Sequence, residues 1–187
     1  MSVTALLVMD VQNAVVDRYP DPDYLPRLAT AIHAARTAGL PVIYPMVEFR
    51  EGGPEISPRN KMFGRLAGTA PAPGGPGSQI HPDIAPEPGD VIVTKRRVSA
   101  FSGSDLDLLL RAQGVDHLVL TGIATSGVVL STLRQAADLD YGVTVLADGC
   151  LDIDPDVHRT LVEKIFPMQA QVTTIAAWAA EAASAVV

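Results

Sequence analysis

Residues 116–150 read DHLVLTGIATSGVVLSTLRQAADLDYGVTVLADGC, and this stretch decides the fold. Residues 116–122 have the pattern of a buried strand that runs into a glycine turn, 123–138 the pattern of a helix, and 141–148 that of a second strand. Such a unit makes two parallel strands joined by a right-handed crossover. Ligands bind beyond the carboxyl ends of parallel strands. We therefore expect the turn at 122–128 to line a site, with the unpaired N–H groups of the helix start facing it.

The composition predicts one globular domain spanning residues 1–187. The chain has 187 residues, 48% of them hydrophobic, which is enough for a substantial core. A net charge of -7 and a pI near 4.9 argue against partners with phosphate backbones or anionic lipids. The basic cluster Lys95-Arg96-Arg97 is too short for a nucleic-acid patch, yet it follows a predicted strand and is well placed for a site.

The cysteine content and the chain start favour a cytoplasmic protein. The lone Cys150 excludes an internal disulfide and a cysteine-rich zinc site, and it fits a reducing compartment. No basic segment precedes an apolar run at the start, so we expect no signal peptide. No apolar run reaches the length of a membrane span, so we expect no membrane association.

Strand and helix patterns alternate along the whole chain. This alternation predicts a three-layer α/β/α sandwich around a parallel sheet. Pro41 and Pro45 interrupt the second strand, so we expect that strand to be short or at an edge of the sheet. The predicted strands span 4–10, 40–47, 89–95, 116–122, 141–148 and 170–174, and the helices 23–39, 105–113, 123–138, 155–166 and 175–185.

Residues 48–88 are rich in glycine and proline and show no regular pattern. A connection this long inside a compact domain usually has a function. One interpretation is a surface excursion or an oligomer contact. The other is a lid or pocket wall that carries Phe49, Arg50 and Phe63.

Two charged residues follow strands whose carboxyl ends should meet at one edge of the sheet. Asp10 ends the first strand and Lys95 the third. Alone, each is more often a solvated or capping residue. Together they predict an ion pair in a cleft, in which Lys95 keeps Asp10 ionised or positions its proton.

At this point the chain resembles the isochorismatase-like superfamily, also called the cysteine hydrolase family. The matching stretches are 7–13 (LVMDVQN), 93–101 (VTKRRVSAF) and 120–132 (LTGIATSGVVLST). The resemblance implies a six-stranded parallel sheet of order 3-2-1-4-5-6, and catalytic residues at Asp10 and Lys95. It also implies a homo-oligomer, a dimer or tetramer.

The sequence departs from the family at the nucleophile. The cysteine of the amidases falls on Val128, and a valine cannot form a thioester. Cys150, beyond the next predicted strand, is interpreted as structural, and no histidine is evident beside Thr125 or Ser126 to make either a nucleophile. The resemblance still implies a cis peptide between residues 123 and 124 and an oxyanion hole formed by the amides of Ala124 and Val128.

True isochorismatases also lack the cysteine, and they resemble this arrangement in using the aspartate to protonate a vinyl ether. That route needs Asp10 and Lys95 but not residue 128. In those enzymes, however, a tyrosine stands where this chain has Ala124, a glycine where it has Val128, and a glutamine where it has Val47. The substrate need not be isochorismate.

Five further residues are candidates for substrate binding. Arg97 and Arg50 are suited to bind a carboxylate bidentately. Phe49 and Phe101 can wall an apolar ring, and Gln12 lies two residues beyond Asp10. The alternative is that the arginines are ordinary surface residues and Phe101 belongs to the core.

We expect no metal and no cofactor. The four histidines have no ligand spacing, and none lies in 48–60, where nicotinamidases hold a metal ion. They are His33, His81, His117 and His158.

The leading hypothesis is therefore a hydrolase that acts on a small carboxylic acid through Asp10 and Lys95, with water and no covalent cysteine intermediate. The alternatives are an inactive member that binds a small molecule or acts through its oligomeric surface, and a lyase or isomerase that uses the same pair.

Overall fold

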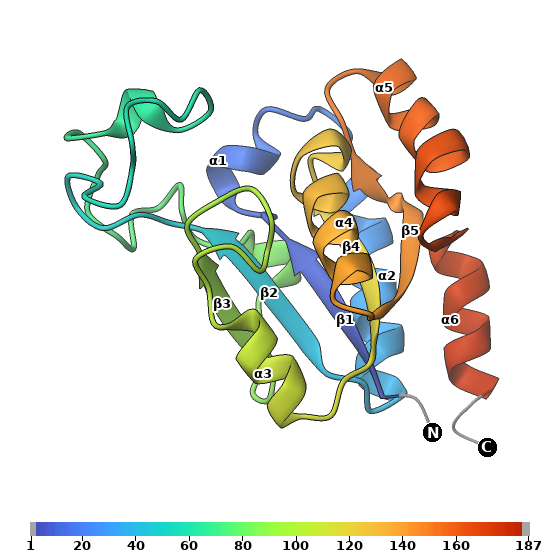
Figure 1. Cartoon of the computed structure of the whole chain (residues 1–187). Helices are drawn as coiled ribbons and strands as arrows, with labels where there is room; N and C mark the ends of the chain where they lie inside the picture. Colours follow the sequence, from blue (N-terminus) through green and yellow to red (C-terminus); the bar gives the residue numbers. More distant parts are fainter. Residues whose placement is uncertain (1–2, 185–187) are drawn as a thin grey trace.

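The computed structural model describes residues 3–184 and contains a single parallel sheet. Its six strands lie in the order β3-β2-β1-β4-β5-β6, as predicted (Figure 1). The strands are β1 (Thr4–Met9), β2 (Val42–Val47), β3 (Val91–Lys95), β4 (His117–Ile123), β5 (Gly142–Leu151) and β6 (Gln171–Thr173). The helices are α1 (Asn13–Val16), α2 (Tyr24–Thr37), α3 (Leu106–Ala112), α4 (Leu130–Asp138), α5 (Pro155–Thr160) and α6 (Ile175–Ser184).

Helices cover both faces of the sheet, which confirms the three-layer sandwich. The central strand β1 is apolar throughout because both of its faces are buried. Leu7 and Met9 belong to the core cluster that contains residues of α3 and α4, whereas Leu6 and Val8 belong to the cluster that contains residues of α2 and α6. The two sets alternate because successive side chains of a strand point to opposite faces.

The prediction for the second strand was wrong. β2 pairs with β1 on one side and with β3 on the other, so it is an interior strand. Pro45 is accommodated because its carbonyl still accepts a hydrogen bond, 2.8 Å from the Asp10 amide, at the point where β1 ends. The strand therefore lacks one donor without losing its place in the sheet.

The β4–α4 unit is built as predicted, except at the turn and in the length of β5. A π-helical turn, η3 (Thr125–Val129), precedes α4. Gly122 has φ +139°, and a Cβ atom there would lie 2.3 Å from the Met9 carbonyl oxygen, so only glycine allows β4 to approach β1 this closely. β5 continues to Leu151, and Cys150 is thus inside the strand.

The last part of the chain also follows the prediction in outline. Asp154 caps α5 by accepting hydrogen bonds from the amides of Asp156 and Val157. The helix then continues as the π turn η4 (Leu161–Ile165) and the 3₁₀ turn η5 (Phe166–Met168). The expected closing helix is α6, and Ala185 at its predicted end lies outside the described residues. No helix within residues 3–184 has the length and apolar content needed to cross a membrane.

Between β2 and β3 the chain leaves the sheet and forms a separate lobe (Figure 1). The lobe carries the 3₁₀ turn η1 (Gly64–Leu66). The chain then returns to the sheet, where the 3₁₀ turn η2 (Pro82–Ile84) packs against α2 and Ile84 joins the core cluster on that face. A small apolar cluster of its own, with Phe49, Ile56 and Ala70 buried, holds the lobe together. We call residues 48–78 the loop wall, because many of them face the cavity described next.

Candidate active site

A cavity of about 670 Å³ lies between the carboxyl ends of the strands and the loop wall. The strand side contributes Asp10, Lys95 and the turn after β4, as the parallel topology predicts. The loop wall contributes aromatic and aliphatic side chains, so the cavity has a polar floor and an apolar lining. The residues from the loop wall are Glu48, Phe49, Met62, Phe63, Arg65, Leu66, Pro71, Ala72, Gly75, Pro76, Gly77 and Ser78.

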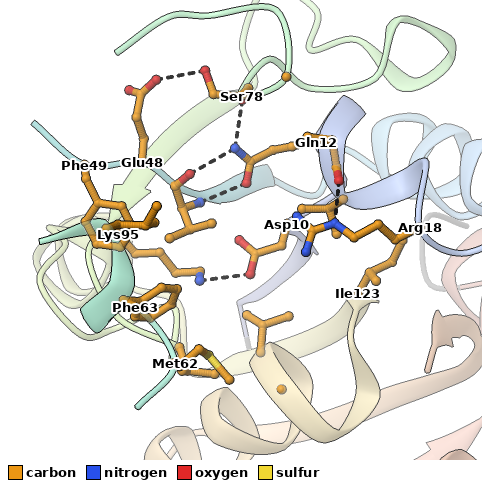
Figure 2. Close-up of a pocket in the computed structure, with 18 of the residues that line it drawn as sticks. Asp10, Gln12, Arg18, Glu48, Phe49, Met62, Phe63, Ser78, Lys95 and Ile123 are labelled. Atoms are coloured by element: carbon orange, nitrogen blue, oxygen red, sulfur yellow. Dashed lines mark hydrogen bonds and ion pairs between the residues drawn. The ribbon is translucent and has the colours of Figure 1, made fainter. Parts of the chain in front are cut away.

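Asp10 and Lys95 form the predicted ion pair at the floor of the cavity. The Lys95 Nζ atom lies 2.9 Å from Oδ2 of Asp10, and the two side chains are 1% and 11% exposed (Figure 2). Nζ also donates to the carbonyl of Arg97 at 3.0 Å, which fixes the ammonium group. The backbone of Asp10 has φ 55°, a left-handed conformation that turns the chain out of β1.

The Asp10 carboxyl group is poised to exchange a proton near neutral pH. Burial raises its pKa from 3.8 to about 6, because loss of solvation penalises the charged form, while Lys95 opposes the shift. Its second oxygen, Oδ1, has no hydrogen-bond partner within residues 3–184. A buried oxygen without a partner is suited to accept a proton or a donor from a bound ligand.

Gln12 lines the cavity, but its amide is engaged with the backbone. Nε2 donates to the carbonyls of Val47 at 3.0 Å and Ser78 at 2.8 Å, and Oε1 accepts from the Val47 amide at 3.0 Å (Figure 2). The side chain thus ties the start of α1 to the end of β2 and to the loop wall. Gln12 was predicted as a substrate contact, and this arrangement instead supports a role in positioning the two walls.

The turn after β4 brings Ala124 and Val128 to the cavity, where the oxyanion hole was expected. The peptide bond between Ile123 and Ala124 is cis. The Ala124 carbonyl accepts hydrogen bonds from the amides of Gly127 at 3.0 Å and Val129 at 3.2 Å, which holds the turn closed. Val128, only 2% exposed, places an aliphatic side chain at the cavity surface where the family resemblance would put a nucleophile.

Cys150 is separated from the cavity. It is 2% exposed, belongs to the core cluster under α4, and lies 4.0 Å from the Leu120 carbonyl through its sulfur. Burial raises the pKa of its thiol to about 12, so a thiolate is strongly disfavoured. This environment is that of a structural cysteine.

One statement about the turn was wrong, because a histidine does lie beside Thr125. The Thr125 Oγ1 and His158 Nδ1 atoms are 2.8 Å apart, and His158 comes from α5. Burial lowers the pKa of His158, although Asp152 opposes the shift. Neither Thr125 nor His158 lines the cavity, and Thr125 is fully buried. The contact therefore connects the turn to α5 outside the cavity.

Three predicted binding residues do not reach the cavity. Arg97 donates to the carbonyls of Arg96 and Glu55, and Arg50 lies 3.5 Å from the Glu55 carboxylate. Phe101 packs in the core with its ring 5.9 Å from that of Tyr141. Both arginines are engaged instead with oxygen atoms of Glu55, and Arg97 also with the carbonyl of Arg96. Of the predicted aromatic residues, Phe49 lines the cavity, in edge contact with Phe63 at 5.1 Å.

Sequence reasoning missed two cations of the cavity, Arg18 and Arg65. Arg18 lies two residues after the end of α1 and four residues after Ala14. Had a helix been predicted there, the spacing of four would have placed Arg18 and Ala14 on the same face. Arg65 lies in η1, where no periodic pattern predicted a structure. Within residues 3–184 there is no group of three or more His, Cys, Asp or Glu side chains able to hold a metal ion.

The comparisons with known proteins agree with this architecture. A family model described as "Isochorismatase domain" matches residues 4–177. The chain is similar to a ureidoacrylate amidohydrolase of Stutzerimonas stutzeri, with 37% identity over 179 residues that cover 83% of this chain and 72% of that one. It is also similar to an uncharacterized isochorismatase family protein of Bacillus subtilis, with 32% identity over 170 residues that cover 88% and 86%.

Solved structures show the same likeness over nearly the whole chain. An isochorismatase family protein from Burkholderia thailandensis has a TM-score of 0.86 and 32% identity, with coverage of 97% of this chain and 96% of that one. An N-carbamoylsarcosine amidase from Thermoplasma acidophilum has a TM-score of 0.75 and 26% identity, with coverage of 92% and 96%.

Proposed function

The chain belongs to the isochorismatase family of hydrolases, and we propose that it hydrolyses the amide or ureido bond of a small carboxylic acid without a covalent cysteine intermediate. The observation that carries this proposal is the buried Asp10–Lys95 pair, with an Asp10 oxygen that lacks a partner among the described residues. The similarity to a ureidoacrylate amidohydrolase supports a C–N bond as the bond cleaved.

In the proposed reaction Asp10 acts first as a base. It takes a proton from a water molecule whose oxygen attacks the substrate carbonyl carbon, and the resulting oxyanion is stabilised by the amides of Ala124 and Val128. When the C–N bond breaks, Asp10 returns the proton to the leaving nitrogen. Lys95 keeps enough of Asp10 ionised for the first step, because its charge opposes the effect of burial on the pKa.

A second candidate reaction uses Asp10 as an acid. With a pKa of about 6, a fraction of the carboxyl groups retains its proton near neutral pH, as protonation of a vinyl ether would require. Isochorismate is the test substrate for this reaction, and release of pyruvate is its readout.

The remaining parts of the proposal concern the setting in which the protein acts. We propose a homo-oligomer in the cytoplasm, without bound metal or cofactor. The exposed side chains of Ile153 and Met168, 75% and 73% accessible, are candidates for a subunit contact. Light scattering of the purified protein measures the oligomeric state.

The experiment that tests the proposed chemistry compares Asp10→Asn with Cys150→Ser. Turnover of ureidoacrylate and of isochorismate is measured for both variants and for the wild type. We expect Asp10→Asn to lose about a thousandfold in kcat, as for removal of a general acid–base group, and Cys150→Ser to keep wild-type activity. Loss of activity in Cys150→Ser with retention in Asp10→Asn would overturn the proposal. A wild-type protein that turns over neither ureidoacrylate nor isochorismate would also overturn it.

A further inference from the structure

The charged side chains around the cavity are unevenly paired. Lys95 neutralises Asp10, and Glu48 is held by the Ser78 hydroxyl at 3.0 Å and the Gly74 amide at 2.7 Å. Arg18 and Arg65, the other charged side chains among the lining residues, form no ion pair within residues 3–184. The cavity lining thus has three cations, Lys95, Arg18 and Arg65, against two anions, Asp10 and Glu48, and neither arginine is in an ion pair with a described residue.

Arg18 is fixed in a way that leaves its hydrogen-bonding fork available. Its Nε atom donates to the Ala14 carbonyl at 2.8 Å, and neither Nη group has a hydrogen-bond partner among the described residues. Figure 2 shows Arg18 among the residues that line the cavity together with Asp10 and Ile123. Because one donor is anchored and the guanidinium is planar, less side-chain entropy is lost when a bidentate acceptor binds.

Apolar side chains line most of the cavity. Val15 and Tyr19 lie close to Arg18 in the chain, and Phe63 and Leu66 flank Arg65 in the loop wall. A ligand that fits this lining has an apolar body. A planar anionic group on that ligand would accept hydrogen bonds from the Nη atoms of Arg18. The reacting group of the ligand would then point to Asp10.

We propose that Arg18 is the carboxylate-binding residue of the cavity and that Arg65 supplies a second, weaker cation from the opposite wall. The ligand is then a small monocarboxylic acid in which a short apolar segment separates the carboxylate from the group that meets Asp10. This inference rests on the proposed function for the identity of the reacting group, but carboxylate binding itself requires no turnover.

The test measures binding of matched acids and neutral amides by calorimetry at low ionic strength. Benzoate is compared with benzamide, and crotonate with crotonamide. For the wild type we expect at least one acid to bind about tenfold more tightly than its amide, and Arg18→Gln to abolish that preference. Arg18→Lys keeps part of it, since a point charge replaces the fork. Arg65→Gln weakens acid binding by about threefold, in the range of a solvent-exposed ion pair.

Arg59→Gln is the matched control, because Arg59 is exposed on the loop wall and does not line the cavity. It should leave acid binding unchanged. Equal binding of acids and amides by the wild type, or a preference that survives in Arg18→Gln, would overturn the inference.

Asp10→Asn separates this inference from the proposed function. The variant should bind benzoate or crotonate at least as well as the wild type, because a negative charge leaves the cavity. If it retains turnover while Arg18→Gln loses the preference for acids, the proposed chemistry fails and the carboxylate site stands. If Asp10→Asn is inactive while Arg18→Gln still prefers acids, the carboxylate site fails and the chemistry stands.

Discussion

The two walls of the cavity are built in different ways. The strand wall, which holds Asp10, Lys95 and the 123–129 turn, consists of strand ends anchored in two large core clusters. The loop wall is held by one small cluster around Phe49, Ile56 and Ala70, and by side-chain bonds from Gln12 and Glu48.

This difference suggests that the two walls have different roles in the reaction. Groups that exchange protons must keep a fixed geometry, and the sheet gives them that. Groups that select a ligand can lie on irregular chain, which tolerates changes in length and sequence. The strand wall therefore carries the proposed chemistry, and the loop wall and Arg18 select the ligand.

Lys95→Met should have the largest effect of the substitutions that probe this comparison. Without the ammonium group the pKa of Asp10 rises further above 6, so less of the base form is present at pH 7. We expect kcat/KM for ureidoacrylate to fall by about a hundredfold or more.

The control for this substitution is Lys61→Met, on the loop wall outside the cavity lining. It should change kcat/KM by less than about twofold, because Lys61 is exposed and makes no ion pair with any residue in 3–184. Thermal unfolding of both variants checks that they fold. A folded Lys95→Met protein with wild-type activity would remove Lys95 from the chemistry.

Val128→Cys tests whether the turn after β4 has the geometry that a nucleophilic thiol needs. The substitution changes the volume little, so the turn should fold. We expect the introduced thiol, which would face the cavity, to react with iodoacetamide to one equivalent. The wild type should not react, because Cys150 does not line the cavity and the pKa of its thiol is about 12. Amide turnover should rise by about tenfold and become sensitive to alkylation.

Val128→Ala is the comparison variant, since it opens the same space without a thiol. An introduced thiol as inert as Cys150, with turnover no higher than in Val128→Ala, would mean that the turn lacks the geometry for nucleophilic attack.

Phe63→Ala probes the loop wall and should have a smaller effect. The ring lines the cavity in edge contact with Phe49 and carries no group that can exchange a proton. We expect KM to rise by about tenfold, equivalent to roughly 1.4 kcal/mol, with kcat within about twofold.

The contrasting substitution is Phe101→Leu, which alters an aromatic residue in the core. It should lower the free energy of unfolding, by about 1 kcal/mol, and leave KM unchanged. A fall in kcat rather than a rise in KM for Phe63→Ala would contradict the division between the two walls.

The sequence predicted the strand wall well because its signals are strong. Buried parallel strands read as continuous apolar runs, and a polar residue at the end of such a run must lie at the edge of the sheet. Asp10 and Lys95 were found in this way. The strand order came from the family resemblance. The interior position of the strand that contains Pro45 was not predicted, because the rule that proline avoids interior strands does not tell whether the sheet can do without that one N–H donor.

The interpretation of residues 48–88 as a pocket wall agrees with the positions of Phe49 and Phe63 in the cavity lining. The arginines were predicted poorly, because their contacts are irregular and distant in sequence. Arg97 was predicted to bind a carboxylate because it follows a strand. Its guanidinium instead donates hydrogen bonds to the carbonyls of Arg96 and Glu55. Arg18 was missed because a one-turn helix leaves little pattern. His158 lies 33 residues from Thr125, and only the folded chain brings them together.

The pH dependence of kcat/KM for ureidoacrylate tests the central claim most directly. Burial raises the pKa of Asp10 to about 6, and the proposed base is the ionised form. Activity should therefore rise about tenfold per pH unit below pH 6 and level off above it. In Lys95→Met the midpoint should move to higher pH. A wild-type profile that is flat from pH 5 to about 7, or that falls through this range, would contradict the assignment of Asp10 as the base.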